Sequence, residues 1–144
     1  MKIEINEGFP ELQIIINCPE MSDDVEKIAA AVRSFDKKLF GKADGQTRVI
    51  DWRDVFYFES VDKRCFIYTA DKIYETPLKL YEIEDRLTGS GFFRSAKSQI
   101  INIMKIASLY PDFGGRIEVM MENGEKLIVS RQYSKSLKRR LELK

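Results

Sequence analysis

Hydrophobic residues in the first 41 positions follow two different periods. Residues 2–5 alternate between charged residues and isoleucine, and residues 12–16 form an apolar, largely β-branched run, so we predict two short strands. Further along, apolar positions recur at spacings of three and four, which predicts an amphipathic helix with Asp23 as N-cap and Glu26 as its capping-box partner. The residues expected on its apolar face are Val25, Ile28, Ala29, Val32, Phe35 and Leu39. We therefore expect a small β-β-α unit over residues 1–41.

The chain changes character after this unit. Gly41, Gly45 and the polar residues between them interrupt the helical period, so we interpret residues 42–47 as a linker. Beyond it, aromatic and β-branched residues dominate, and Asn123-Gly124 strongly favours a hairpin. The strands expected in this part cover residues 55–60, 64–69, 72–76, 92–94, 104–109, 116–121 and 125–129.

Two helical patterns accompany these strands. Leu80, Ile83 and Leu87 share one face of a short helix that glycines terminate. A basic helix with its own apolar stripe is expected over residues 133–143. The fold class is therefore mainly β with short helices, and residues 48–144 form the main domain.

Composition narrows the functional classes. Apolar residues make up 44% of the chain and charged residues 33%, as in a globular protein. The chain has neither the ~20 consecutive apolar residues of a bilayer span nor the apolar core of a signal peptide, so we expect a cytoplasmic protein. Cys18 and Cys65 stand far apart and histidine is absent, which predicts two reduced thiols, no metal or other cofactor, and no histidine-based catalysis.

Charge is distributed unevenly along the chain. Residues 1–44 carry a net charge of −3, whereas residues 45–144 carry +4. Residues 126–144 contain seven basic residues and one acidic residue. A basic end on a domain of mixed charge suggests a polyanionic partner, although a basic helix can also be merely solvated.

Three segments place long cations beside small hydroxyl groups next to predicted strands. They are residues 60–65, 94–98 and 130–133. Hydroxyls and lysines suit phosphate oxygens, and an arginine can also form a bidentate pair with a guanine edge. Each segment alone could be a solvated turn. Together they indicate a β-rich domain with a nucleic-acid surface.

Four stretches in a fixed order resemble the LytTR DNA-binding domain family. Residues 55–60 are similar to its aromatic strand ending in Glu-Ser, and residues 78–84 to its short helix. Residues 91–102 resemble its Phe-x-Arg-x-x-Lys-Ser-x-x-Val-Asn signature, and residues 123–133 its closing Asn-Gly and Val-Ser-Arg-x-Tyr. The resemblance covers residues 45–143.

This resemblance implies an elongated fold of small stacked sheets whose loop residues enter successive major grooves of duplex DNA. Carried over by position, Lys97 and Arg131 would be the principal groove-inserted residues. Arg94, Ser98 and Ser130 would contact the DNA backbone or shape the loops.

For other positions the resemblance assigns a role less directly. Some relatives place a histidine where this chain has Cys65, so Lys63 or Arg64 is expected to supply the contact of the first loop. Lys135 of the basic helix is a further expected DNA contact, and Asn102 is interpreted as capping a local turn.

The resemblance also bears on organisation. Response regulators of the family usually carry a receiver domain of roughly 110 to 130 residues, which the 44 residues before the match cannot hold. The chain therefore looks like a stand-alone regulator. We expect a homodimer on repeated promoter sequences, to which the helix in residues 1–41 could contribute, and no small-molecule substrate.

Two other classes remain open. The N-terminal helix face could dock on a membrane sensor or another regulator, which would make the chain a non-catalytic interaction module. An enzyme would have to rely on Ser60 and Lys63, a Ser-x-x-Lys string at a hairpin tip instead of on a helix.

Overall fold

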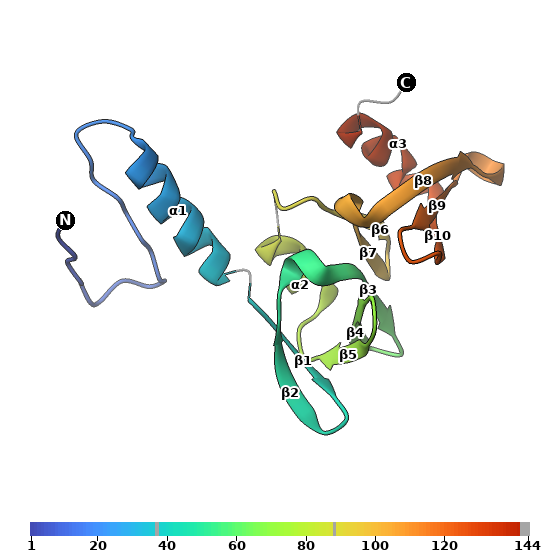
Figure 1. Cartoon of the computed structure of the whole chain (residues 1–144), viewed down its shortest axis with the longest axis horizontal. Coiled ribbons are helices and arrows are strands. Elements are labelled where there is room, and N and C mark those ends of the chain that lie inside the picture. Colours follow the sequence, from blue (N-terminus) through green and yellow to red (C-terminus); the bar gives the residue numbers. More distant parts are fainter. Residues whose placement is uncertain (37, 88, 142–144) are drawn as a thin grey trace. The chain divides into compact units, whose positions relative to one another are not determined.

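The computed structural model describes residues 1–36, 38–87 and 89–141. Contacts divide the chain into two compact units, Met1–Phe35 and Asp36–Lys144. The elements are α1 (Asp23–Asp36), β1 (Leu39–Ala43), β2 (Gln46–Ile50), β3 (Val55–Val61), β4 (Arg64–Thr69), β5 (Ile73–Thr76), α2 (Leu80–Arg86), β6 (Phe92–Ala96), β7 (Gln99–Asn102), β8 (Ile106–Pro111), β9 (Ile117–Met121), β10 (Lys126–Val129) and α3 (Arg131–Arg140) (Figure 1). The expected mainly β fold with short helices is confirmed.

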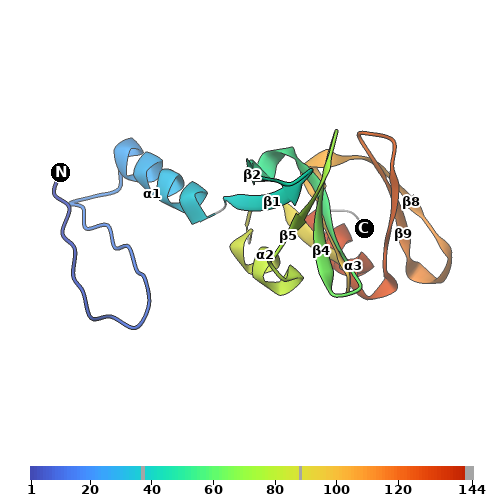
Figure 2. The ribbon, with the colours of Figure 1, turned by 90° about the horizontal axis from the view of Figure 1, so that it is seen from below.

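The second unit contains two antiparallel sheets. Seven strands form one sheet in the order β2-β1-β5-β4-β3-β7-β6, and three strands form the other in the order β10-β9-β8. Figure 2 shows α2 and α3 as separate short helices beside these strands. Short 3-10 turns at Trp52–Asp54, Ile103–Lys105 and Phe113–Gly115 connect several strands.

Each face of the seven-stranded sheet has its own core. Successive residues of a strand point to opposite faces, so Phe92 and Phe93 of β6 enter different cores, as do Ile100 and Ile101 of β7. Residues of α2 complete the first core, and residues of β9, β10 and α3 complete the second. The central strands therefore support both the short helix and the small sheet.

A polar contact also joins the two sheets. The hydroxyl of Tyr57 in β3 donates to Oε2 of Glu125, beside the β9–β10 turn, at 2.7 Å. The ring of Tyr57 stacks on Tyr68 with centroids 4.2 Å apart. Burial, and then the bond to a carboxylate, raise the pKa of Tyr57 well above its ordinary value.

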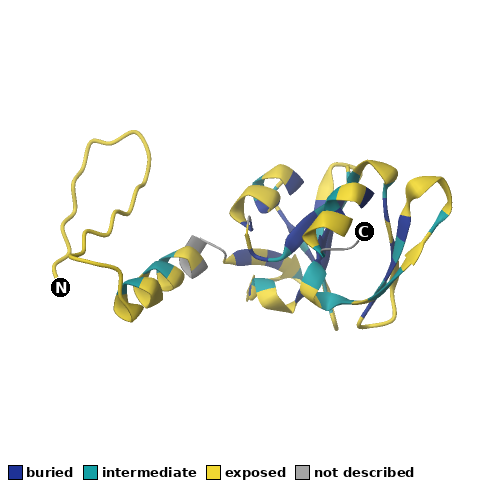
Figure 3. Ribbon diagram, turned by 90° about the horizontal axis from the view of Figure 1, so that it is seen from above, coloured by how far each residue is buried: buried dark blue, intermediate teal, exposed yellow. Residues whose placement is uncertain are grey.

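The N-terminal unit differs from its prediction. Residues 1–22 form no strand and are exposed, because a strand needs a neighbour to pair its backbone groups and this segment has none in its unit (Figure 3). The helix is confirmed, with Val25, Ala29 and Val32 half-buried. Ser22, not Asp23, caps it: Val25 N donates to Ser22 Oγ at 3.4 Å.

The end of that helix also differs. Leu39 was expected on its apolar face, yet it begins β1 and is fully buried in the first core of the sheet. The side chain of Phe35 lies outside the described residues.

The expected linker over residues 42–47 is instead the turn of the β1–β2 hairpin. Ala43 pairs with Gln46, and Asp44 and Gly45 take positive φ angles of 53° and 75°. Close packing requires a glycine at position 41, because an added Cβ would lie 2.6 Å from Tyr74 Cβ. The domain therefore begins with β1.

Candidate nucleic-acid interface

The first two predicted loops meet at one end of the seven-stranded sheet. The β3–β4 turn is formed by Asp62 and Lys63, both with positive φ. β7 pairs antiparallel with β3, so the β6–β7 turn lies beside the end of β3. Ser60 N donates to Ser98 O at 2.8 Å, which ties the two loops together.

A second backbone hydrogen bond brings in the third loop. Ser130 N donates to Ser95 O at 2.9 Å and so attaches the start of α3 to β6. Ser130 is the N-cap of α3, and Arg131 is its first residue. Lys97 and Arg131 therefore project from adjacent loops of one hydrogen-bonded framework. We call the β3–β4 turn, the β6–β7 turn and the start of α3 the interface end.

The β6–β7 turn is held from beneath by Arg94. Its Nε donates to Ala96 O at 2.8 Å, Nη2 donates to Lys97 O, and Nη1 lies 3.3 Å from Glu84 Oε1. The side chain of Arg94 is only 20% exposed. Of the two roles expected for Arg94, the geometry favours loop shaping over a contact with the DNA backbone.

The same turn is also pinned by a buried serine. Ser95 is fully buried, and its Oγ donates to Gln99 Oε1 at 2.9 Å. Lys97 and Ser98, at the tip, are both exposed. A buried polar base with an exposed tip gives these two side chains a defined direction toward solvent.

The remaining cations fall into two groups. Lys63, Lys97, Arg131 and Lys135 are exposed, and within the described ranges none of them forms an ion pair. Arg64 instead pairs with Glu75 of β5, and its guanidinium lies 5.5 Å from the centroid of the Phe66 ring. This pairing lowers the pKa of Glu75, mainly through the side-chain hydrogen bond. Lys63 is thus better placed than Arg64 for a phosphate.

Two further sequence interpretations can be checked at this end. Cys65 is 5% exposed in the first core, and burial raises its pKa to about 11. Asn102 is 1% exposed; its Nδ2 donates to Val55 O at 2.9 Å and its Oδ1 accepts from Met104 N at 3.0 Å. The structural role of Asn102 is confirmed.

Helix α3 is anchored so that its first turn stays at the interface end. Leu137 is 1% exposed in the second core, and Arg140 Nη1 donates to Phe92 O at 2.9 Å. Ser134 Oγ donates to Ser130 O at 3.0 Å. Arg131 and Lys135, four residues apart, share the exposed face.

One part of the site was missed by sequence reasoning. The turn between β8 and β9 contains Gly114 and Gly115, and Gly115 lies against the side chain of Arg131. The two glycines signal a turn, but their contact with a residue sixteen positions further along has no signature in a linear pattern.

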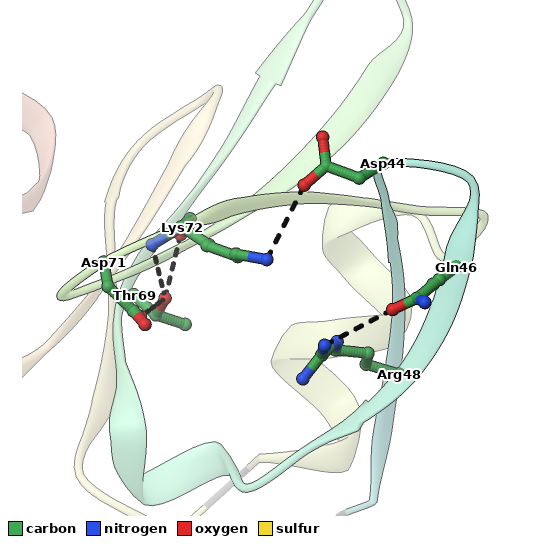
Figure 4. Close-up of polar contacts among 6 residues, drawn as sticks. All are labelled: Asp44, Gln46, Arg48, Thr69, Asp71 and Lys72. Atoms are coloured by element: carbon green, nitrogen blue, oxygen red, sulfur yellow. Dashed lines mark hydrogen bonds and ion pairs between the residues drawn. The ribbon is translucent and has the colours of Figure 1, made fainter.

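The opposite end of the sheet contains the β1–β2 and β4–β5 turns, and its lysine is paired with a carboxylate. Lys72 Nζ lies 3.6 Å from Asp44 Oδ2, which links the two turns (Figure 4). Thr69 Oγ1 donates to Lys72 O at 2.8 Å. Arg48 Nη2 donates to Gln46 Oε1 at 3.3 Å along β2. We call these two turns the opposite end.

Comparison with known families decides the assignment. The model of the LytTr DNA-binding domain family matches residues 45–142. The chain belongs to this family. A solved LytTr DNA-binding domain from Bacillus cereus superposes on 72% of this chain and 95% of its own, with a TM-score of 0.69 and 26% identity.

Relatives of similar length extend the match beyond the LytTR domain. Two Staphylococcus aureus proteins, from strains NCTC 8325 / PS 47 and COL, bear the name uncharacterized HTH-type transcriptional regulator. Each is 32% identical over 145 residues, covering 99% of this chain and 98% of the relative. In this chain, five strands (β6–β10) separate α2 from α3, so these two helices do not form a helix–turn–helix. None of the described helices is long and apolar enough to cross a membrane.

Proposed function

We propose that this LytTR chain regulates transcription by inserting Lys97 and Arg131 into the major grooves of one duplex. The observation that carries the proposal is the pair of backbone hydrogen bonds, Ser60–Ser98 and Ser95–Ser130, that joins three loops into one framework. Because Lys63, Lys97 and Arg131 form no ion pair in the described part of the chain, they are available to phosphates and base edges.

The side chains suit different parts of the DNA. Arg131 can form a bidentate pair with a guanine, whereas Lys97 offers a point charge for a base edge or a phosphate. Ser98 and Ser130 suit phosphate oxygens near these grooves, and exposed Lys63 and Lys135 would add phosphate contacts on either side. Arg94 acts by fixing the turn that presents Lys97.

The proposal is tested by binding at two salt concentrations. The chain is used to enrich a duplex from a random-sequence library, and that duplex and the DNA upstream of its own gene are titrated by fluorescence anisotropy. Neutralised phosphates release counterions, so affinity should fall about tenfold or more between 50 and 200 mM salt. Failure to enrich any duplex, with no binding to the upstream DNA at low salt, would contradict the proposal.

We further propose that two copies bind spaced repeats and that the N-terminal unit holds them together. This unit leaves many large apolar side chains exposed: Met1, Ile3, Ile5, Phe9, Leu12, Ile14, Ile15, Ile16 and Met21. So many large apolar side chains exposed along one segment indicate an association site. Light scattering with and without a two-repeat duplex should give a dimer on DNA. A monomer at high concentration on that duplex, or co-purification with a membrane sensor, would contradict self-association.

The proposal that the protein binds DNA also bears on its location in the cell and on whether it is an enzyme. The relatives are bacterial, and bacterial duplex DNA lies in the cytoplasm, where we place the working protein. We assign no catalytic step, because Ser60 stands on strand β3 and not on a helix of the kind that carries the Ser-x-x-Lys string in hydrolases. Labelling of Ser60 by a fluorophosphonate probe would contradict this assignment.

A further inference from the structure

We infer that Gly115 is a positioning residue for Arg131, and that the β8–β9 turn thereby sets the base preference of the third loop. The inference rests on the proposed function, because it concerns how Arg131 is presented to DNA. Gly115 is sixteen residues from Arg131 in the chain and belongs to none of the three loops that carry the exposed cations.

The contact is close and extends along the arginine side chain. A Cβ added to Gly115 would lie 3.3 Å from Arg131 Cγ, 3.7 Å from Cδ and 3.8 Å from Nε. Three successive heavy atoms of Arg131 therefore run beside the backbone of the turn. The absence of a side chain at position 115 lets the arginine occupy this space.

The turn that provides this surface is itself fixed. Asp112 N donates to Arg116 O at 3.0 Å, and Arg116 Nε donates to Phe113 O at 3.1 Å. Arg116 Nε also lies 3.6 Å from Asp112 Oδ2. A turn closed by these contacts can act as a wall for a neighbouring side chain.

The wall matters because little else restrains the guanidinium. Arg131 is exposed, and within the described ranges its guanidinium forms no hydrogen bond or ion pair. Its backbone is fixed by the first turn of α3 and by the adjacent Ser130–Ser95 bond, and its aliphatic stem is restricted by Gly115. A bidentate pair with a base requires a defined direction, so Gly115→Ala, whose added Cβ displaces the stem from its place against the turn, should reduce discrimination among bases more than overall affinity.

The chain offers a matched control in Gly114. Gly114 and Gly115 have φ angles of 71° and 80°, so alanine is strained to a similar degree at both. A Cβ at Gly114 has no atom within 4 Å, whereas a Cβ at Gly115 meets Arg131. The difference between Gly115→Ala and Gly114→Ala therefore isolates the contact with Arg131 from the backbone strain.

The experiment measures discrimination with the duplex enriched by the unmodified chain and its single-base-pair variants. The base pairs at which Arg131→Ala loses discrimination are identified first. At these base pairs, Gly115→Ala should reduce discrimination about tenfold, which is the scale of one base contact. The discrimination of Gly114→Ala should stay within about twofold of that of the unmodified chain. Combined with Arg131→Ala, the Gly115→Ala change should have no further effect on discrimination.

A readout on the free protein separates positioning from simple destabilisation. The ¹⁵Nε chemical shift of Arg131, which reports the displacement of its side chain by the added Cβ, should change in Gly115→Ala and stay unchanged in Gly114→Ala. If the alanine variants do not fold, the asparagine pair at the same positions repeats the comparison, because asparagine tolerates positive φ.

The possible failures are distinguishable. Equal discrimination by the two glycine variants, or an effect of Gly115→Ala that persists without Arg131, overturns the inference and leaves DNA binding intact. A library from which the unmodified chain enriches no duplex overturns the proposed function, and the inference with it.

Discussion

The two ends of the seven-stranded sheet are built from similar tight turns and differ in what their charges do. At the opposite end, Lys72 is paired with Asp44, so a cation and an anion offset each other. At the interface end, Lys63, Lys97 and Arg131 are exposed without such partners in the described part of the chain. The same scaffold therefore presents one end whose lysine is offset by a carboxylate and one end whose lysines and Arg131 are left for a polyanion.

The two ends also differ in how their turns are joined. The opposite end is linked by an exposed ion pair, which contributes at most about 1 kcal/mol. The interface end is linked by backbone hydrogen bonds at Ser60–Ser98 and Ser95–Ser130, and by Arg94 beneath the β6–β7 turn. The two ends thus differ in the pairing of charge and in the fixing of loops, which the shared strand architecture does not determine.

The largest contrast is expected between Arg131→Ala and Lys72→Ala. Each removes one exposed cation, but only Arg131 stands at the interface end. Arg131→Ala should cost about 1–3 kcal/mol, roughly 5- to 150-fold in affinity for the enriched duplex, and relax preference at one base pair. Lys72→Ala should change affinity less than about twofold. Anisotropy titrations at one fixed salt concentration measure both.

Arg131→Lys refines this contrast. Lysine keeps the charge and loses the planar fork, so it should retain non-specific affinity while losing base preference. Equal losses for Arg131→Ala and Lys72→Ala would mean that net charge alone governs binding, and the distinction between the two ends would be wrong.

A second test removes the support of the β6–β7 turn. Arg94→Met keeps much of the buried stem but leaves the carbonyls of Ala96 and Lys97 without their donor. We expect a loss of about 1–3 kcal/mol in unfolding free energy by guanidinium titration, because the half-buried carbonyl of Ala96 and the exposed carbonyl of Lys97 both lose a charged donor. Affinity for the enriched duplex should fall about tenfold, comparable to a lost direct contact.

Glu84→Gln serves as the control, since it removes the carboxylate of the Arg94 pair and leaves both turn carbonyls bonded. It should change stability and DNA affinity only slightly. Full DNA binding by a folded Arg94→Met variant would show that the turn needs no internal support.

Lys97→Ala should have a smaller and different effect. If Lys97 neutralises one phosphate, its loss lowers the slope of log affinity against log salt by about 0.9 and costs a few-fold in affinity at low salt. If Lys97 instead contacts a base edge, the slope of log affinity against log salt should stay unchanged and discrimination among base pairs should fall. A variant that changes neither quantity would remove Lys97 from the interface, and Lys72→Ala again provides the baseline.

The fold was predictable where turn signals bracket a strand. β4 has the bounds expected from its aromatic and β-branched residues, and the Asn123-Gly124 hairpin joins β9 and β10 as expected. The β1–β2 hairpin was missed because Gly41 suggests a linker, whereas it is required by the approach of Tyr74, 33 residues away. Residues 12–16 have the composition of a strand, but a strand forms only when its backbone groups can pair with a neighbouring strand.

The site was predictable in its residues and not in its connections. The family motifs identify Lys97 and Arg131, and the structure places both on adjacent loops. The register of β3 with β7 determines the Ser60–Ser98 bond, and local sequence does not reveal that register. The sequence does not distinguish Lys63 from Arg64 as the DNA contact of the first loop. The structure does, because Glu75, diagonal to Arg64 across β4 and β5, pairs with Arg64.

The smallest expected effects compare Lys63 with its neighbour Arg64. Lys63→Ala should weaken binding about two- to fivefold, since one phosphate contact is lost, and Arg64→Ala less than about twofold, since Glu75 already holds its charge. Glu75→Gln should release Arg64 and raise affinity slightly at low salt. That gain should vanish in the double variant with Arg64→Ala. If Arg64→Ala instead weakens binding more than Lys63→Ala, Arg64 exchanges its pair with Glu75 for a DNA phosphate. Charge pairing in the free protein would then not show which cations stay out of the interface.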